Sequence, residues 1–305
     1  MIEHAGSASI GEVLRYAARE LAYFDTARLD AEVLLGHVLG CDRVALVRDR
    51  DRRIDATMNA EFAALVAARV QGQPVAQLRG IQEFWSINFY VNEQVLIPRE
   101  ETELLVATAL AVLPRSRRIT LADLGTGCGA VALALGSELS EATILALDRS
   151  PAALQVARCN QRRLRLDNVH LLQSDWLSAV RGNTLDAVLA NPPYIAADDP
   201  LLQYSSLRYE PMTALASGLD GLSDLAAITA AAPHVLVDDG WLMLEHSASQ
   251  GARVRLLFEN AGFSAVATMP DLAGLERVTV GRKTAKKSQR SHPTPRTVAA
   301  ENSDG

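Results

Sequence analysis

The stretch ITLADLGTGCGA, residues 119–130, decides the fold of this chain. An apolar run of strand length leads into three closely spaced glycines, and an apolar segment of helical length follows. Glycine permits backbone turns that a side chain would block, and it lets a ligand approach the main chain closely. The stretch therefore predicts a strand, a nucleotide-binding loop and a helix, and the loop residues are Gly125, Thr126, Gly127, Cys128 and Gly129.

The alternation of strands and helices continues after this loop. Apolar runs predict strands over 143–148, 169–175, 185–191 and 240–246, and helices are expected over 129–139, 151–164, 222–236 and 253–261. Continuous apolar strands between helices predict an α/β fold with a mostly parallel sheet covered on both faces. The last two strands, 262–269 and 276–282, are joined by a short loop and could pair as an antiparallel hairpin at the sheet edge.

The segment before this region has a different pattern. Residues 9–71 predict helices alone, over 10–22, 26–40 and 55–70, with Asp25 or Thr26 capping the second and Gly40 ending it. Aromatic and β-branched residues over 83–99 then predict a hairpin with Asn92 at its turn. We expect a helical substrate-recognition domain over 1–75, a connector and hairpin over 76–98, a catalytic domain over 99–282 and a disordered basic tail over 283–305.

Composition excludes several classes of protein. The chain has 305 residues and a net charge of −6, and because its C-terminal segment is basic, the rest is more acidic still. Such a body lacks the general attraction for phosphate backbones expected of a dedicated nucleic-acid binder. No apolar run is long enough for a membrane span and no signal peptide is evident, so we expect a cytoplasmic protein. The three cysteines and six histidines are scattered, so neither a disulfide framework nor a metal site is expected.

Acidic and aromatic residues follow the next two strands. Asp148 ends the strand after the glycine loop, about twenty residues on, where a carboxylate commonly accepts hydrogen bonds from ribose hydroxyls. Asp175 and Trp176 end the following strand and could border an adenine ring. These strand ends share the carboxyl edge of the sheet, the usual ligand crevice. A nicotinamide enzyme and an S-adenosylmethionine enzyme both use this arrangement. The residues that end the fourth strand distinguish these two classes.

The fourth strand ends in NPPY, residues 191–194. Two prolines make a stiff corner that supplies carbonyl oxygens and no N–H donors. If a methyl sulfonium lies at this edge and the acceptor is a planar –NH2 group, the Asn191 side-chain oxygen can accept one hydrogen and the Pro192 carbonyl the other. Tyr194 can pack on the flat acceptor. This positioning replaces a strong base, so no catalytic histidine is needed.

In combination, DLGTGCGA, LALD, QSDW and NPPYI, with EFWS and a LIPRETE-like segment upstream, resemble the release factor glutamine methyltransferases. The resemblance runs to about Arg282 and implies a class I, Rossmann-like seven-stranded fold. It implies S-adenosylmethionine-dependent methylation of the glutamine N5 in the Gly-Gly-Gln motif of class I peptide chain release factors. It assigns cofactor binding to residues 125–129, Asp148, Asp175, Trp176 and Asn191, and catalysis to Asn191, Pro192 and Tyr194. Substrate binding falls to Asn191, Pro192, Pro193, Tyr194, Phe84 and Arg99, and framing roles to 208–211, Asp271, Gly274 and Arg277.

Two positions depart from the family pattern. Glu100 stands where proline is usual, and Cys128 stands where threonine is commoner, but neither change removes a group that the chemistry uses. Four alternatives remain open: a ribosomal-protein glutamine N5-methyltransferase, an adenine-N6 nucleic-acid methyltransferase that extrudes its base, a nicotinamide dehydrogenase, and a binding module without catalysis. No membrane partner and no direct nucleic-acid substrate are expected.

Overall fold

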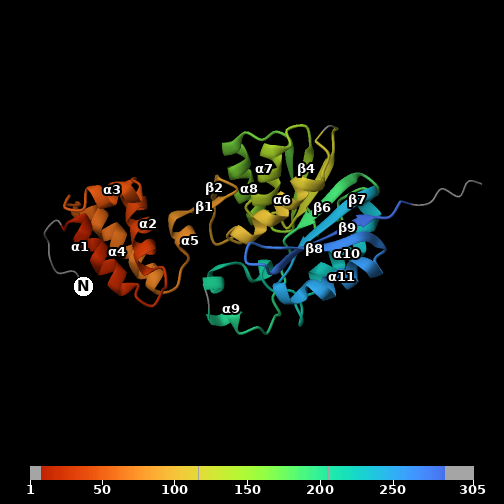
Figure 1. Cartoon of the computed structure of the whole chain (residues 1–305). Helices are drawn as coiled ribbons and strands as arrows, with labels where there is room; N and C mark the ends of the chain where they lie inside the picture. Colours follow the sequence, from red (N-terminus) through yellow and green to blue (C-terminus); the bar gives the residue numbers. More distant parts are fainter. Residues whose placement is uncertain (1–7, 116, 205, 286–305) are drawn as a thin grey trace, which may run out of the picture.

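The computed structural model describes residues 8–115, 117–204 and 206–285. Figure 1 shows a helical region at the N-terminal end, joined through a short helix and a hairpin to a larger α/β region. The helices of the N-terminal region and the connecting helix are α1 (Ile10–Glu20), α2 (Ala27–Leu39), α3 (Arg43–Arg48), α4 (Ala56–Val70) and α5 (Val75–Arg79). Only α3 and α5 had no counterpart in the sequence prediction for this region.

Local signals explain where these helices begin and end. Ser9 and Glu12 form a reciprocal capping box at the start of α1, which satisfies N–H groups that have no partner within the helix. Gly40 ends α2 in the left-handed conformation, as predicted, whereas Thr26 precedes α2 without a side-chain capping bond. The helices enclose their own apolar core, and Arg69 forms an ion pair with Asp30 at 2.7 Å beside it.

The turn of the hairpin lies at residues 85–86, earlier in the chain than the turn expected at Asn92. Strands β1 (Ile81–Phe84) and β2 (Ile87–Tyr90) pair antiparallel around Trp85 and Ser86, so the turn predicted at Asn92 is wrong. Both turn residues have positive φ, 54° and 56°, the geometry that matches the twist of two-residue hairpins. The Glu103 carboxylate accepts the Trp85 N–H at 2.7 Å, a tertiary contact that favours this turn despite its unfavourable residues.

The α/β region is built on a mixed sheet that has seven strands over the described part of the chain, in the order β5-β4-β3-β6-β7-β9-β8. The first five of these are parallel, and β9 pairs antiparallel with both β7 and β8, which confirms the predicted closing hairpin. The strands are β3 (Thr120–Leu124), β4 (Thr143–Asp148), β5 (Val169–Gln173), β6 (Leu185–Ala190), β7 (Leu236–Glu245), β8 (Phe263–Pro270) and β9 (Glu276–Lys283).

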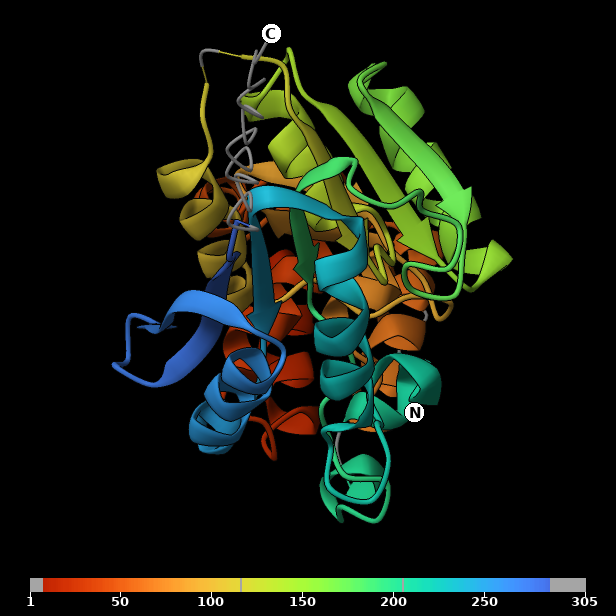
Figure 2. The same ribbon diagram turned by 90° about the vertical axis from the view of Figure 1, so that its right-hand side faces the viewer.

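Helices cover both faces of this sheet (Figure 2). Alternate strand residues enter two separate cores: Leu189 and Met243 lie in one, and Val188 and Leu242 lie in the other. The first core is closed by α6 (Glu103–Val112), α7 (Ala130–Glu138) and α8 (Pro151–Leu164), and the second by α10 (Ser223–Val235) and α11 (Gly251–Asn260). Burial on both faces explains why the central strands are continuously apolar.

Short helical turns occupy the connections: η1 (Glu100–Thr102), α9 (Leu201–Tyr204), η2 (Ser206–Tyr209), η3 (Met212–Ala214) and η4 (Ala248–Gln250). The predicted disordered tail falls mainly on residues 286–305, which lie outside the described residues, whereas Lys283 belongs to β9. Within the described ranges, no helix is both long and apolar enough to cross a membrane.

Candidate active site

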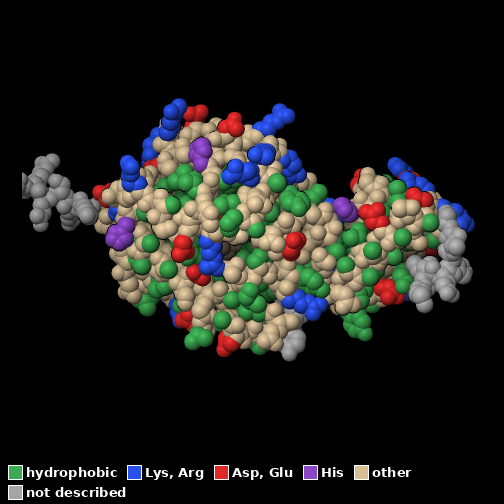
Figure 3. Space-filling view, turned by 180° about the vertical axis from the view of Figure 1, so that it is seen from behind, with side chains coloured by type: hydrophobic (Ala, Val, Ile, Leu, Met, Phe, Trp, Pro, Cys, Tyr) green, Lys and Arg blue, Asp and Glu red, His purple; other side chains and the backbone are tan. Residues whose placement is uncertain are grey.

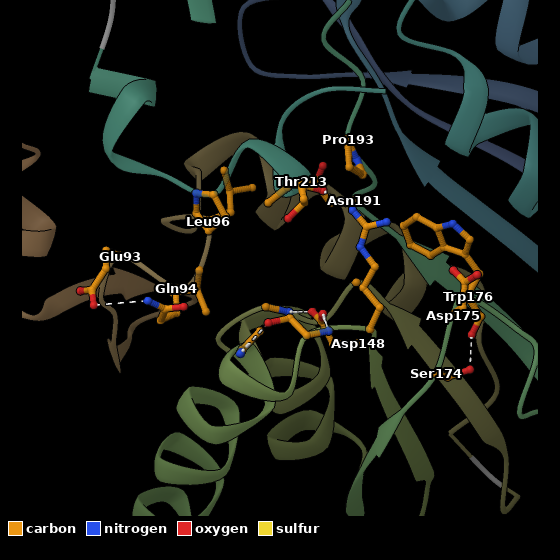
Figure 4. Close-up of a pocket in the computed structure, with 18 residues that line it drawn as sticks. Glu93, Gln94, Leu96, Asp148, Ser174, Asp175, Trp176, Asn191, Pro193 and Thr213 are labelled. Atoms are coloured by element: carbon orange, nitrogen blue, oxygen red, sulfur yellow. Dashed lines mark hydrogen bonds between the residues drawn. The ribbon is translucent and has the colours of Figure 1, made fainter. Parts of the chain in front are cut away.

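A cavity of about 240 Å³ opens at the carboxyl ends of β3, β4, β5 and β6 (Figure 4). This edge is where parallel α/β sheets usually bind ligands. Of the residues that the sequence analysis singled out for a role in the site, those lining the cavity include Gly125, Gly127, Asp148, Asp175, Trp176, Asn191, Pro193 and Pro211. Segments distant in the sequence therefore converge on one site.

The glycine loop is held open toward this cavity. Gly125, Gly127 and Gly129 all have positive φ, which side chains rarely tolerate. A Cβ at Gly127 would approach only the Gly125 carbonyl oxygen, at 4.0 Å, so the space beside this residue is free for a ligand. The loop residues Thr126, Cys128 and Gly129 do not line the cavity: the first two are buried behind it, and Gly129 caps α7.

Asp148 fixes the loop from the neighbouring strand. Its Oδ2 accepts the Gly127 N–H at 2.9 Å and its Oδ1 accepts the Ser150 N–H at 2.8 Å. Each carboxylate oxygen keeps a further lone pair, so hydroxyl donors in the cavity can still be accepted. Asp148 therefore organises the loop as well as presenting negative charge to the cavity.

Asp123 supports the same loop from beneath. Its carboxyl accepts the Thr126 hydroxyl at 2.6 Å and the Ala132 N–H at 3.2 Å, and burial raises its pKa to about 7. Burial also raises the pKa of the Cys128 thiol to about 12, so this cysteine remains a neutral thiol packed in the core. Cys128 contributes its backbone here, where its carbonyl accepts from Asn160.

Trp176 forms one side of the cavity. It has a positive φ of 44°, and its indole N–H donates to Asp224 at 3.2 Å. The ring faces the glycine loop, since a Cβ built on Gly125 would lie 3.4 Å from it. Asp175 beside it is exposed, and Figure 4 draws both residues at one end of the cavity, with Glu93, Gln94 and Leu96 at the other.

The NPPY corner closes the other side. Asn191 lines the cavity, and its Nδ2 donates to the Thr102 hydroxyl at 3.0 Å. Pro193 also lines the cavity, whereas Pro192 is buried and does not. Tyr194 is not among the residues that line the cavity, and its hydroxyl donates to Glu245 at 3.4 Å. Burial raises the pKa of this tyrosine, so the phenol stays protonated.

Glu245 is a buried carboxyl behind this corner, at the end of β7. Its side chain is almost fully enclosed, and burial raises its pKa to about 7, while hydrogen bonding to Thr102 and the charge of Arg277 oppose the rise. Arg277 is held in turn by Asp271 at 3.0 Å. Two of the predicted framing residues, Asp271 and Arg277, thus form an ion pair whose arginine charge acts on Glu245, and Gly274 adopts positive φ in the loop between β8 and β9.

The structure separates Phe84 and Arg99 from the cavity. Phe84 is only 1% exposed and packs edge-on against Phe89 in the first core, so the expectation that it lines the substrate entrance is wrong. Arg99 forms an ion pair with the fully buried side chain of Glu210, whose other oxygen accepts the Ile97 N–H at 2.8 Å. This contact ties the segment before η1 to the loop that carries the predicted 208–211 motif.

Several lining residues had no readable sequence signal. They come from segments that only tertiary structure brings to the sheet edge: Glu93, Gln94, Val95, Arg149, Ser150, Ala153, Thr213 and Ala214. Position directly after Asp148 could have indicated Arg149. Thr102 lies in the LIPRETE-like segment but was given no role from the sequence, and Glu245 lies in no motif that we recognised. Among the described residues, no cluster of three or more potential metal ligands occurs.

Comparisons with known proteins agree with this architecture. Residues 12–80 match the family described as PrmC N-terminal domain, and residues 101–203 match the Methyltransferase small domain. A crystal structure of a methyltransferase from Pyrococcus furiosus is 14% identical, with a TM-score of 0.51, and the match covers 75% of this chain and 100% of that one. The fold and the matched domain define a methyltransferase of the class I, Rossmann-like type.

Relatives in sequence give a narrower assignment. The chain is 47% identical over 255 residues to the release factor glutamine methyltransferase of Xylella fastidiosa strain 9a5c, covering 84% of this chain and 93% of the relative. It is 42% identical over 269 residues to that of Escherichia coli strain K12, covering 88% and 97%. The chain belongs to the release factor glutamine methyltransferase family.

Proposed function

We propose that this protein transfers a methyl group from S-adenosylmethionine to the side-chain amide nitrogen of the glutamine in the Gly-Gly-Gln motif of class I peptide chain release factors. The observation that carries the proposal is the convergence of the NPPY corner, the glycine loop and Asp148 on one cavity. Membership of the family supports the same activity.

The cavity residues fit S-adenosylmethionine. The positive-φ glycines leave space at the main chain for its methionine part, Asp148 has lone pairs free for the ribose hydroxyls, and Trp176 offers a flat face to the adenine. When bound, the cofactor supplies an electrophilic methyl group on a sulfonium. Because Thr126, Cys128 and Gly129 lie behind the cavity, any part they take in binding comes through the backbone of the loop.

The chemistry expected at Asn191 is positioning. An amide nitrogen is a poor nucleophile because its lone pair is delocalised, so the site must orient that lone pair toward the methyl group. The Asn191 Oδ1 and the Pro192 carbonyl can each accept one hydrogen of the substrate amide, and the proline corner brings no competing donor. After methyl transfer the amide nitrogen is cationic and still carries both hydrogens, so one of them is lost as an acidic proton and the other remains in the product. Alignment and electrostatics can therefore replace a strong general base.

A protein substrate also fits the connection between the two regions. The Gln77 side chain donates to the Tyr209 carbonyl at 2.8 Å, and the Tyr209 hydroxyl donates to the Gln71 carbonyl at 2.7 Å. The same loop continues to Pro211 and Thr213, which line the cavity. We therefore assign substrate recognition to the helical region, residues 1–75, which is mechanically linked to the cavity wall.

Surface charge favours a protein over a nucleic acid as the substrate. Figure 3 shows many of the Lys and Arg side chains of the α/β region along its upper part and acidic side chains lower on the same face, and the net charge of the whole chain is −6. An adenine-N6 methyltransferase would need a basic track for the phosphate backbone. A ribosomal-protein substrate shares the amide chemistry and differs only in the partner recognised, so it is the alternative that experiment must separate.

The test offers the recombinant protein radiolabelled S-adenosylmethionine with one of four substrates. These are a purified class I release factor, its Gly-Gly-Ala version, a ribosomal-protein control and RNA. We expect label in the intact release factor alone. Label in the Gly-Gly-Ala factor or in RNA would overturn the assignment, and label in the ribosomal protein alone would transfer it to the alternative substrate. Calorimetric binding of a nicotinamide cofactor in place of S-adenosylmethionine would establish the dehydrogenase reading instead.

A further inference from the structure

Asn191 has an amide whose two ends differ chemically but are nearly equal in shape. Only its oxygen can accept a hydrogen from a substrate –NH2 group, so a rotation of the amide by 180° would replace an acceptor with a donor. The side chain therefore needs a partner that distinguishes its two ends. In this structure that partner is the Thr102 hydroxyl, which accepts from Nδ2 at 3.0 Å.

The Thr102 hydroxyl can either donate a hydrogen bond or accept one. The groups around it decide which of the two it does toward Asn191. Thr102 is only 4% exposed and lies at the end of η1, directly before α6. Its hydroxyl has one hydrogen, and hydrogen bonding to Glu245 is among the effects that lower the pKa of that carboxyl. An ionised carboxylate can only accept, so it draws the Thr102 hydrogen toward itself and leaves the oxygen as an acceptor for Asn191.

The Glu245 carboxyl is otherwise poorly satisfied. Its Oε1 accepts the Tyr194 hydroxyl at 3.4 Å, whereas its Oε2 is buried and has no hydrogen-bond partner among the described residues. Leaving a buried carboxyl oxygen unsatisfied is costly, and such groups in native structures commonly have a functional reason. The Thr102 hydroxyl is a donor able to reduce that cost.

We propose that Glu245 and Thr102 are positioning residues that hold the Asn191 amide with its nitrogen toward Thr102 and its oxygen toward the cavity. In this arrangement Asn191 donates to Thr102 and Tyr194 donates to Glu245, and the Thr102 hydroxyl is the donor available to the second oxygen of the same carboxylate. The catalytic role of this orientation rests on the proposed function, because the Asn191 oxygen then serves as an acceptor for the substrate amide. The orientation itself is a property of the protein alone.

Protonation of Glu245 would reverse these donor and acceptor roles. A protonated carboxyl can donate to the Thr102 oxygen, which frees the Thr102 hydrogen to donate to Asn191 and favours the rotated amide. The groups that face this carboxyl are Thr102 and Glu101 on the η1 side, Tyr194 after β6, and Arg277 on β9. Because its pKa is raised to about 7, the ionised form is lost as the pH falls through neutrality.

The experiment compares Thr102→Val with Thr102→Ser. Valine keeps the shape and removes the hydroxyl, whereas serine keeps the hydroxyl. Thr108→Val on α6, where the threonine is also buried, is the matched control for loss of a threonine hydroxyl near this site. We expect Thr102→Val to lower kcat on the release factor by about 10- to 100-fold, the scale of a misplaced reacting group. We expect Thr102→Ser and Thr108→Val to stay within about 3-fold of the wild type, because both keep the hydroxyl at position 102.

Two readouts distinguish positioning from a structural role. In the wild type, kcat should rise with pH through about 7, and Glu245→Gln, which cannot ionise there, should lack that rise. In ¹⁵N-labelled protein without substrate, the Asn191 side-chain N–H signals, identified by their loss in Asn191→Asp, should exchange slowly with solvent. They should exchange faster in Thr102→Val and stay slow in Thr108→Val.

The NMR result decides the inference even if no release factor is methylated, which would refute the proposed function separately. Unchanged Asn191 exchange in Thr102→Val would overturn the inference. So would full activity of Thr102→Val, an equal loss of activity in Thr108→Val, or a pH rise that persists in Glu245→Gln.

Discussion

Replacing Asn191 by alanine removes two interactions, and their sizes can be considered separately. The first is the hydrogen bond from Nδ2 to Thr102, whose loss should cost about 1 kcal/mol of folding stability. The second is the Oδ1 acceptor at the cavity wall. Losing one aligned electrostatic contact of this kind costs about 3–4 kcal/mol in the transition state, a fall of roughly 10²- to 10³-fold in kcat. Catalysis should therefore fall far more than stability.

The assay measures initial rates of methyl transfer to a release factor at saturating S-adenosylmethionine, together with the free energy of unfolding in urea. Asn168→Ala is the matched control, because the Asn168 amide donates to the Gly136 and Leu139 carbonyls away from the cavity. It should lose stability and keep its rate. An Asn191→Ala enzyme with a rate within about 3-fold of the wild type would refute the alignment of the substrate amide by Asn191.

Three further outcomes follow from single side chains. Asp148→Ala removes the acceptor of the Gly127 N–H and the proposed ribose contact, so calorimetry should show S-adenosylmethionine affinity lower by about tenfold or more; unchanged affinity would exclude that contact. Phe84→Ala should cost about 3–5 kcal/mol in urea unfolding and leave the KM for the release factor unchanged in the folded protein, because Phe84 lies in the core; a selective rise in KM would restore the substrate role. Arg69→Met leaves the buried Asp30 carboxylate unpaired and should cost about 3–5 kcal/mol, seen as a lower urea midpoint; an unchanged midpoint would show that the ion pair contributes no net stability.

Local patterns predicted much of the architecture because local physics fixes them. The helix α8 spans the residues that its apolar spacing and Pro151 indicated, and Gly40 ends α2 because glycine readily takes the left-handed conformation. The hairpin turn was misplaced for the opposite reason. Trp85 and Ser86 are poor residues for positive φ, and it is contacts such as the one with Glu103 that hold them there.

In the candidate site, too, some features could be predicted from local sequence and others depended on tertiary contacts. The order of strands places Gly127, Asp148, Trp176 and Asn191 at one edge, so a reader of the sequence can expect them to meet. Phe84 was misassigned because a motif reports that a residue recurs in a family and does not report which way its side chain points. In the structure it points into the core.

The sequence by itself determined the class of fold, the glycine loop and the stiff corner at 191–194, because these depend on backbone conformation and on periodic burial within short segments. Only the tertiary structure decided what lies behind that corner. Thr102 and Glu245 are 143 positions apart in the numbering and carry no common motif. They come to the same corner because α6, which begins directly after Thr102, packs against β7, and burial there raises the pKa of the glutamate to about 7. Burial and hydrogen-bond direction are properties of the surroundings, which a linear pattern does not contain.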